Sequence, residues 1–159
     1  MRYEVLSRHL SEQPVAVIKG RLPVEQASQW LPLAYREIFD HVRRQGVAIV
    51  GPPYARYLMG PEQPEMEAGA PVARPVRDAG RVRSSLLPAG PAAVTVHVGP
   101  YEGLREAVRA VSLWVREHGA EPAGAHWEVY YSDPEQEPDP NRWRTEVVQP
   151  YRVEARVPG

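Results

Sequence analysis

The sequence predicts an α+β fold in which a duplicated ββαββ-type unit forms an antiparallel sheet of about eight strands, with two helices on one face and a ligand groove on the other. One observation is a pair of amphipathic helix patterns, each flanked by strand-like segments. The other is an internal repeat: Pro14 and Pro91 begin matching strand segments, and Gly46 and Gly119 end matching helix patterns. We therefore expect a single domain over residues 1–159, made of pseudo-symmetric halves at about 2–78 and 80–152.

The first half is expected to contain four strands and a helix. The strands are expected at residues 3–10, 14–20, 54–59 and 71–76. The helix is expected from about Pro32 to Gln45, because apolar side chains recur there at intervals of three and four residues. A proline is tolerated in a first helical turn, and Gly46 is suited to a left-handed C-terminal cap.

The second half repeats this order. Its strands are expected at 81–87, 91–98, 125–131 and 143–148, with a helix that begins near Pro100 and ends at Gly119. The last two strands most simply pair as an antiparallel hairpin. The acidic, proline-rich loop between them lacks the spaced ligands and central glycine of a calcium loop, so it predicts a stiff hairpin connection.

Composition narrows the class of protein. The 19 basic and 20 acidic residues nearly balance and form no basic block, which argues against direct nucleic acid binding. The absence of cysteine excludes disulfides, thiol nucleophiles and zinc–thiolate sites. We expect no metal and no cofactor, because the histidines lack ligand spacing and no phosphate loop or dinucleotide fingerprint occurs. With neither a signal peptide nor a membrane-spanning run, the sequence predicts a cytoplasmic protein.

Two glutamates near the end of the chain are the candidates for chemistry. Side chains alternate between the faces of a strand, so Glu128 and Tyr130 share a face. Pairing the apolar faces of the last two strands places Glu146 on that same face. A carboxylate among aromatic rings can bind a delocalised cation, or can act as a general acid or base if burial raises its pKa. The alternative is a pair of solvated charges on an open sheet face.

The same segments carry a family resemblance. The motifs are Gly124-x-x-Trp127-Glu128-Val129-Tyr130, Ser132-Asp133-Pro134 and Trp143-Arg144-Thr145-Glu146-Val147. Together with the duplicated plan, they resemble the GyrI-like small-molecule-binding family, which is related to the effector-binding domains of multidrug-sensing regulators of the AraC and MerR types. The resemblance covers about residues 2–152 and leaves no room for a helix-turn-helix, so it implies a stand-alone form.

The resemblance implies a groove lined by aromatic residues and at least one buried glutamate, which accepts bulky, often cationic or planar organic molecules. The implied ligand-binding residues are Glu146, Glu128, Tyr130, Tyr57 and Trp114, and strand alternation adds His97 as a further candidate. If the protein is an enzyme, Glu146 and Glu128 are its expected catalytic residues. Ala55 stands in the first half where Glu128 stands in the second, so we expect a chemically lopsided groove.

Three functions follow from this interpretation. The first is a binding protein that senses or sequesters hydrophobic or cationic small molecules, without membrane or direct nucleic acid contact. The second is a hydrolase of cyclopropane-containing electrophilic natural products that uses a groove glutamate. The third is a protein-interaction module of the gyrase-inhibitor type. The sequence does not decide between a monomer and a dimer, and it assigns Trp30, Trp127 and Trp143 to the core.

Overall fold

The computed structural model describes residues 3–58 and 65–153 of the chain. These residues form two compact units, each with an antiparallel sheet and a helix packed on it. Unit 1 comprises residues 3–10 and 90–153, and unit 2 comprises residues 11–58 and 65–89. The predicted α+β class is therefore confirmed.

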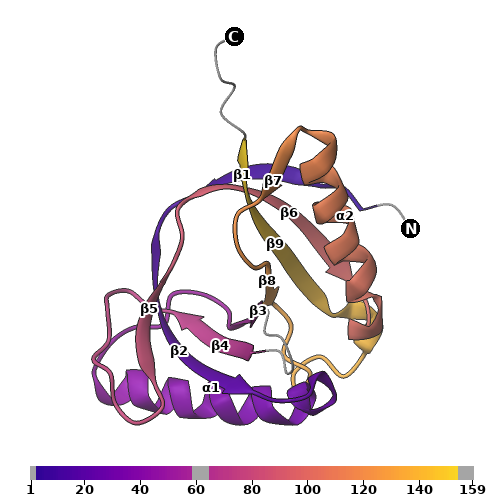
Figure 1. Cartoon of the computed structure of the whole chain (residues 1–159). Coiled ribbons are helices and arrows are strands. Elements are labelled where there is room, and N and C mark those ends of the chain that lie inside the picture. The colour runs from indigo at the N-terminus through magenta and orange to yellow at the C-terminus, as the bar shows by residue number, and fades with distance from the viewer. Residues whose placement is uncertain (1–2, 59–64, 154–159) are drawn as a thin grey trace. The chain divides into compact units, whose positions relative to one another are not determined.

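Unit 2 consists of strands in the order β3, β4, β2, β5, with one long helix. Its elements are β2 (Gln13–Arg21), η1 (Val24–Gln26), α1 (Ala27–Arg44), β3 (Tyr54–Leu58), β4 (Glu65–Pro71) and β5 (Arg83–Leu87). All of the strand pairs are antiparallel. Helix α1 lies along the sheet (Figure 1), where Ile38 and Val42 pack against Ile18 and Ala68. The stripe of apolar residues that predicted the helix thus forms its buried face.

Helix α1 begins earlier than the sequence predicts, so Pro32 lies inside the helix instead of in its first turn. The proline removes one backbone hydrogen bond, and packing of the apolar stripe outweighs this loss. Gly46 follows the helix with a φ of 67°, which confirms the predicted left-handed cap. In the described part of the chain, neither helix is both long enough and apolar enough to cross a bilayer.

The strand expected at 71–76 is wrong, because the partner of β3 is β4 at Glu65–Pro71. The segment 65–71 is rich in alanine and glycine, which have low β propensity, so it gave no strand signal. Pairing extends as far as Val72, which forms an isolated bridge with Ile49, and Pro75 lacks the N–H group that a longer ladder would need.

Unit 1 has the strand order β1, β6, β9, β8. Its elements are β1 (Leu6–Leu10), β6 (Gly90–Val98), η2 (Tyr101–Gly103), α2 (Leu104–Glu117), β7 (Ala120–Pro122), β8 (Trp127–Tyr130), η3 (Pro140–Arg142) and β9 (Arg144–Val153). The short β7, which the sequence did not predict, pairs with the end of β9. Helix α2 lies along β6 and β9 (Figure 1), and Ala107 and Val111 pack on Ala93 and Val147.

The units divide the chain differently from the predicted halves. Strand β1 pairs with β6, and β5 pairs with β2, so the opening strand of each sequence half belongs to the other half's unit. Alternation within a strand predicts which side chains share a face, but it does not specify the partner strand. Apart from this exchange, each unit has a strand, a 3-10 turn, a helix and two further strands in the same order, and unit 1 also contains β7 and η3.

One close approach in unit 2 requires glycine. The ring of buried Tyr54 lies directly over Gly69 in the neighbouring strand, and a Cβ atom at Gly69 would overlap the ring and hydroxyl of Tyr54. The Tyr54 hydroxyl donates a hydrogen bond of 2.9 Å to Oε2 of Glu67, and burial and the Glu67 charge raise the pKa of Tyr54. The missing side chain at Gly69 therefore allows the Tyr54–Glu67 contact.

We expect the substitution Gly69→Ala to lower the free energy of unfolding by about 1–3 kcal/mol, because the added methyl group overpacks the Tyr54 ring. Urea denaturation measures this loss. The same substitution in a Tyr54→Leu background should cost much less. An equal cost in both backgrounds would show that the ring is not the cause.

Candidate functional site

The register between β8 and β9 places the two candidate glutamates on opposite faces of the sheet in unit 1. Glu128 lies opposite Val147, whereas Glu146 lies opposite Val129. Directly opposed residues share a face, and Val147 packs against α2. Glu128 is therefore on the face that α2 covers, and Glu146 is on the other. The expectation of a shared face is wrong because Val147 and Val148 are both apolar, so hydrophobicity could not decide the register.

Glu128 is a buried carboxylate whose polar neighbours lie on its own strand and just before that strand. The residue is 6% exposed. The Tyr130 hydroxyl donates a hydrogen bond of 2.8 Å to its Oε2 atom, and the His126 Nε2 atom lies 3.8 Å from Oε1. The expected pairing of Glu128 with Tyr130 is thus present as a direct contact.

Two further rings extend this site from Tyr130 through Tyr101 to Trp143. Tyr101, in η2, contacts Tyr130 with a centroid distance of 5.7 Å in an edge-on geometry, and Trp143 with a centroid distance of 4.8 Å. Burial, followed by the negative charges of Asp133 and Glu128, raises the pKa of Tyr101. We call Glu128, Tyr130, Tyr101 and Trp143 the Glu128 cluster. The sequence does not predict Tyr101 as a site residue, and it assigns Trp143 to the core.

His97 lies on the same face, but its ring supports the backbone at the start of α2. It stands opposite Thr145 in β9, and Thr145 stands opposite Tyr130 in β8. The His97 Nδ1 atom is 2.8 Å from the Tyr3 hydroxyl, and Nε2 is 2.8 Å from the Pro100 carbonyl oxygen. A proton on Nε2 lets His97 donate to Pro100 and accept from Tyr3. Both ring nitrogens therefore have structural partners.

Glu146 has different surroundings from Glu128. Its neighbours across the two ladders are Val96 and Val129, and the Arg8 Nη1 atom lies 3.4 Å from each of its carboxylate oxygens. Burial and the Glu146 charge raise the pKa of Tyr131, and Arg8 and Arg144 oppose this shift. Glu146 thus lies near Tyr131 and is paired with an arginine of its own unit.

The structure does not bring Trp114 to the Glu128 cluster. Its ring stacks on His118 at 3.8 Å and contacts Tyr151 at 5.6 Å, at the C-terminal end of α2. Tyr101, by contrast, precedes the N-terminal end of α2. Trp114 packs with the core of unit 1.

Tyr57 belongs to unit 2, where it packs with Met66 and Trp30 beside the start of α1.

Unit 2 also contains a buried glutamate that the sequence does not predict. Glu67 is 3% exposed and lies between Lys19 and Arg56 of the adjacent strands. It is the counterpart of Glu146, because both occupy the same register position in their sheets. Its burial is the one feature that marks Glu67 as a candidate. The sequence could not show this burial, because residues 65–71 were not predicted to form a strand.

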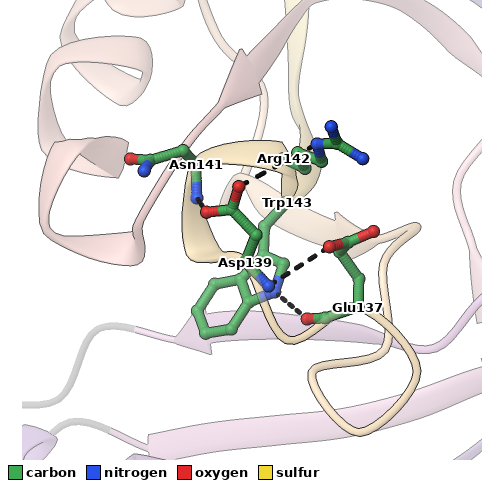
Figure 2. A network of polar contacts seen from close by, with 5 residues as sticks. All are labelled: Glu137, Asp139, Asn141, Arg142 and Trp143. Carbon is green, nitrogen blue, oxygen red and sulfur yellow. Dashed lines mark hydrogen bonds and ion pairs between the residues drawn. The ribbon is translucent and has the colours of Figure 1, made fainter.

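The acidic loop before β9 is an ordered connection (Figure 2). The carboxylate of Asp139 accepts a hydrogen bond of 3.0 Å from the backbone N–H of Asn141, and so caps η3. The backbone N–H of Asp139 in turn donates to the Glu137 carboxylate at 3.2 Å, and Arg142 Nε lies 3.9 Å from Asp139. These contacts agree with the predicted role of the loop as a stiff connection.

Because the two glutamates lie on opposite faces of the sheet, we expect each to influence the pKa of a different tyrosine. Glu128→Gln should lower the pKa of Tyr101 and leave that of Tyr131 unchanged, because removing a nearby negative charge favours the phenolate. Glu146→Gln should lower the pKa of Tyr131 and leave that of Tyr101 unchanged. Burial persists in both variants, so each pKa should stay above its ordinary value. NMR titration of tyrosines labelled with ¹³C at Cζ measures these shifts, and a crossed response would contradict the observed register.

Comparison with solved structures supports the fold. The C-terminal domain of EcmrR is 21% identical, with a TM-score of 0.84, over 97% of this chain and all of that domain (100%). In the EcmrR–DNA complex the match has 21% identity and a TM-score of 0.82, and it covers 96% of this chain but only 58% of the EcmrR chain. A structure described as a hydrolase from Listeria innocua is 15% identical, with a TM-score of 0.71, over 94% of this chain and 92% of that one.

SAV2435, solved bound to tetraphenylphosphonium, is 13% identical, with a TM-score of 0.63, over 96% of this chain and 94% of that one. At these identities, the likeness concerns the fold alone.

No curated protein sequence matches the chain. The GyrI-like small molecule binding domain, however, matches residues 4–152. Since that match spans most of the sequence, the chain belongs to the GyrI-like small-molecule-binding domain family.

Proposed function

We propose that unit 1 binds a lipophilic organic cation at the Glu128 cluster, and that the protein senses or sequesters such compounds. The observation that carries the proposal is the buried Glu128 carboxylate, which is hydrogen-bonded to Tyr130, the first of three rings that contact one another in series through Tyr101 to Trp143. Membership in a small-molecule-binding family supports the general class of ligand.

The chemistry of these side chains favours a cation. Burial removes water from a carboxylate and raises the free energy of its charged form. A bound cation relieves that cost, and the faces of tyrosine and tryptophan rings attract positive charge. A ligand with apolar surface also gains from covering the rings, because the hydrophobic effect is proportional to the apolar area removed from water. Charge and apolar surface together therefore define the proposed ligand class.

Glu128 is a better candidate for this role than Glu146. The neighbours of Glu128 are a phenol and an imidazole, whereas Glu146 already has a guanidinium group 3.4 Å away. A cationic ligand at Glu146 would have to compete with Arg8, which is tethered in the same unit. We therefore assign the ligand contact to Glu128 and a structural ion pair to Glu146.

The direct test is isothermal titration calorimetry with tetraphenylphosphonium, the ion in the SAV2435 structure. We expect Glu128→Gln to weaken binding about tenfold or more, which corresponds to ~1.4 kcal/mol or more, because it removes the charge and keeps the shape. Glu146→Gln is the matched control, since Glu146 is a buried glutamate on the adjacent strand that faces the other way. It should leave the affinity nearly unchanged.

The reverse pattern, in which Glu146→Gln weakens binding and Glu128→Gln does not, would move the site to the other face of the sheet. If the wild-type protein binds neither this ion nor planar cationic dyes, cation binding is refuted. A protein-interaction role of the gyrase-inhibitor type would then become the leading hypothesis.

A hydrolase is the second candidate function, because the Tyr130 hydroxyl and His126 hold the Glu128 carboxylate in place, and a positioned carboxylate can act as a general base or acid. The neighbour described as a hydrolase shares this fold. In the proposed reaction, water attacks a cyclopropane carbon as Glu128 accepts one of its protons, the strained C–C bond opens, and the electron pair moves to the conjugated carbonyl oxygen. That oxygen then takes up one proton, which balances the proton that the water lost.

If the protein has this activity, a cyclopropane-containing electrophile should be consumed with the gain of one water, as followed by mass spectrometry. Glu128→Gln should slow turnover by about 100-fold or more, the usual contribution of a general acid or base. Glu146→Gln should retain activity. Tight binding of the electrophile with no hydrated product would leave only the binding function.

A further inference from the structure

Trp143 joins the acidic loop to the segment that carries Tyr101. The backbone N–H of Gly99 donates a hydrogen bond of 2.8 Å to the Trp143 carbonyl oxygen. Gly99 has a φ of 132°, a conformation that favours glycine, and it lies just before η2. The Trp143 ring packs against Tyr101, the first residue of η2. Trp143 is therefore attached to this segment through both its backbone and its ring.

The loop also sets the orientation of the Trp143 ring. The indole Nε1–H donates a hydrogen bond of 2.8 Å to the carbonyl oxygen of Glu137 (Figure 2). Asp139 caps η3, and the backbone N–H groups of Arg142 and Trp143 continue this turn by donating to Asp139 and Pro140 at 3.0 and 3.2 Å. The cap at Asp139 thus holds the residues that lead into Trp143, and Glu137 fixes the plane of its ring.

A continuous series of contacts runs from this loop to the carboxylate. Trp143 contacts Tyr101, Tyr101 contacts Tyr130, and Tyr130 donates to Glu128. Tyr101 is 38% exposed, so its ring presents surface to an incoming molecule while Trp143 packs against it. Because the rings contact one another in defined geometries, a change at Trp143 alters the position of Tyr101.

We propose that Trp143 is a specificity-determining residue of the cation site and that Asp139 is a positioning residue, which together give the site a preference for aryl over alkyl cations. This inference rests on the proposed function of the Glu128 cluster. An aryl group gains from stacked or edge-on contacts with rings whose orientation is held, since aromatic pairs depend on geometry. A tetraalkyl cation has no ring plane to match, so its affinity depends mainly on the Glu128 charge.

The experiment compares tetraphenylphosphonium with tetrabutylammonium by isothermal titration calorimetry on wild type, Trp143→Leu, Asp139→Ala and Asp139→Asn. We expect Trp143→Leu to weaken tetraphenylphosphonium binding by about fivefold and tetrabutylammonium binding by about twofold or less. Asp139→Ala should also lower the ratio of tetraphenylphosphonium affinity to tetrabutylammonium affinity. Asp139→Asn should keep this ratio near the wild-type value, because an asparagine side chain can cap η3 by accepting the same backbone hydrogen bond.

Trp30→Leu is the matched tryptophan control, because Trp30 belongs to unit 2 and packs against the core cluster that contains Leu22 and Met66. It should leave the ratio of the two affinities unchanged, and thermal unfolding of every variant verifies that the folded protein is being compared. An affinity ratio that stays at the wild-type value in Trp143→Leu and Asp139→Ala, while Glu128→Gln still weakens both ions, overturns this inference alone. Failure of the wild-type protein to bind either ion refutes the cation site itself.

Discussion

The register of β8 against β9 is the constraint on which the chemistry of unit 1 depends. Glu128 opposite Val147 puts one carboxylate on the face that α2 covers, next to Tyr130 and the rings at the start of the helix. Glu146 opposite Val129 puts the other carboxylate beside Arg8. A shift of β8 by one residue would move Glu128 to the face that Glu146 occupies. The two carboxylates therefore have different neighbours: Tyr130 and His126 lie beside Glu128, and Arg8 lies beside Glu146.

The two units give their corresponding positions different chemistry. Glu67 in unit 2 and Glu146 in unit 1 hold the same register position, but Glu67 accepts from Tyr54 and lies between Lys19 and Arg56. On the helix-facing side, the position that Glu128 occupies in unit 1 belongs to Ala55 in unit 2. This difference agrees with the expected chemical lopsidedness. The two units thus differ in charge at corresponding positions on the helix-facing side.

The candidate site was predictable in part. The Trp-Glu-Val-Tyr motif identified Glu128 and Tyr130, because alternation along a single strand requires no knowledge of its partner. Tyr101 was missed because it contributes through a turn before α2 that has no periodic pattern. Trp143 was assigned to the core, since sequence alone does not distinguish a packed tryptophan from one that supports a neighbouring ring. The roles of Tyr57, Trp114 and His97 in ligand binding remain predictions, and their observed contacts are with packing or backbone partners.

The sequence by itself determined the α+β class, the two helices with their glycine caps, and most strands, because these features arise from local periodicity and backbone preference. It also determined the family, since Trp127, Glu128 and Thr145-Glu146 lie in short contiguous motifs. The tertiary structure decided which strands pair, which face each glutamate occupies and which rings meet around Glu128. The physical reason is that register and partner choice minimise the free energy of the whole sheet and its helix, which no single segment determines. Val147 and Val148 are adjacent and equally apolar, so the sequence does not show which of them faces the helix.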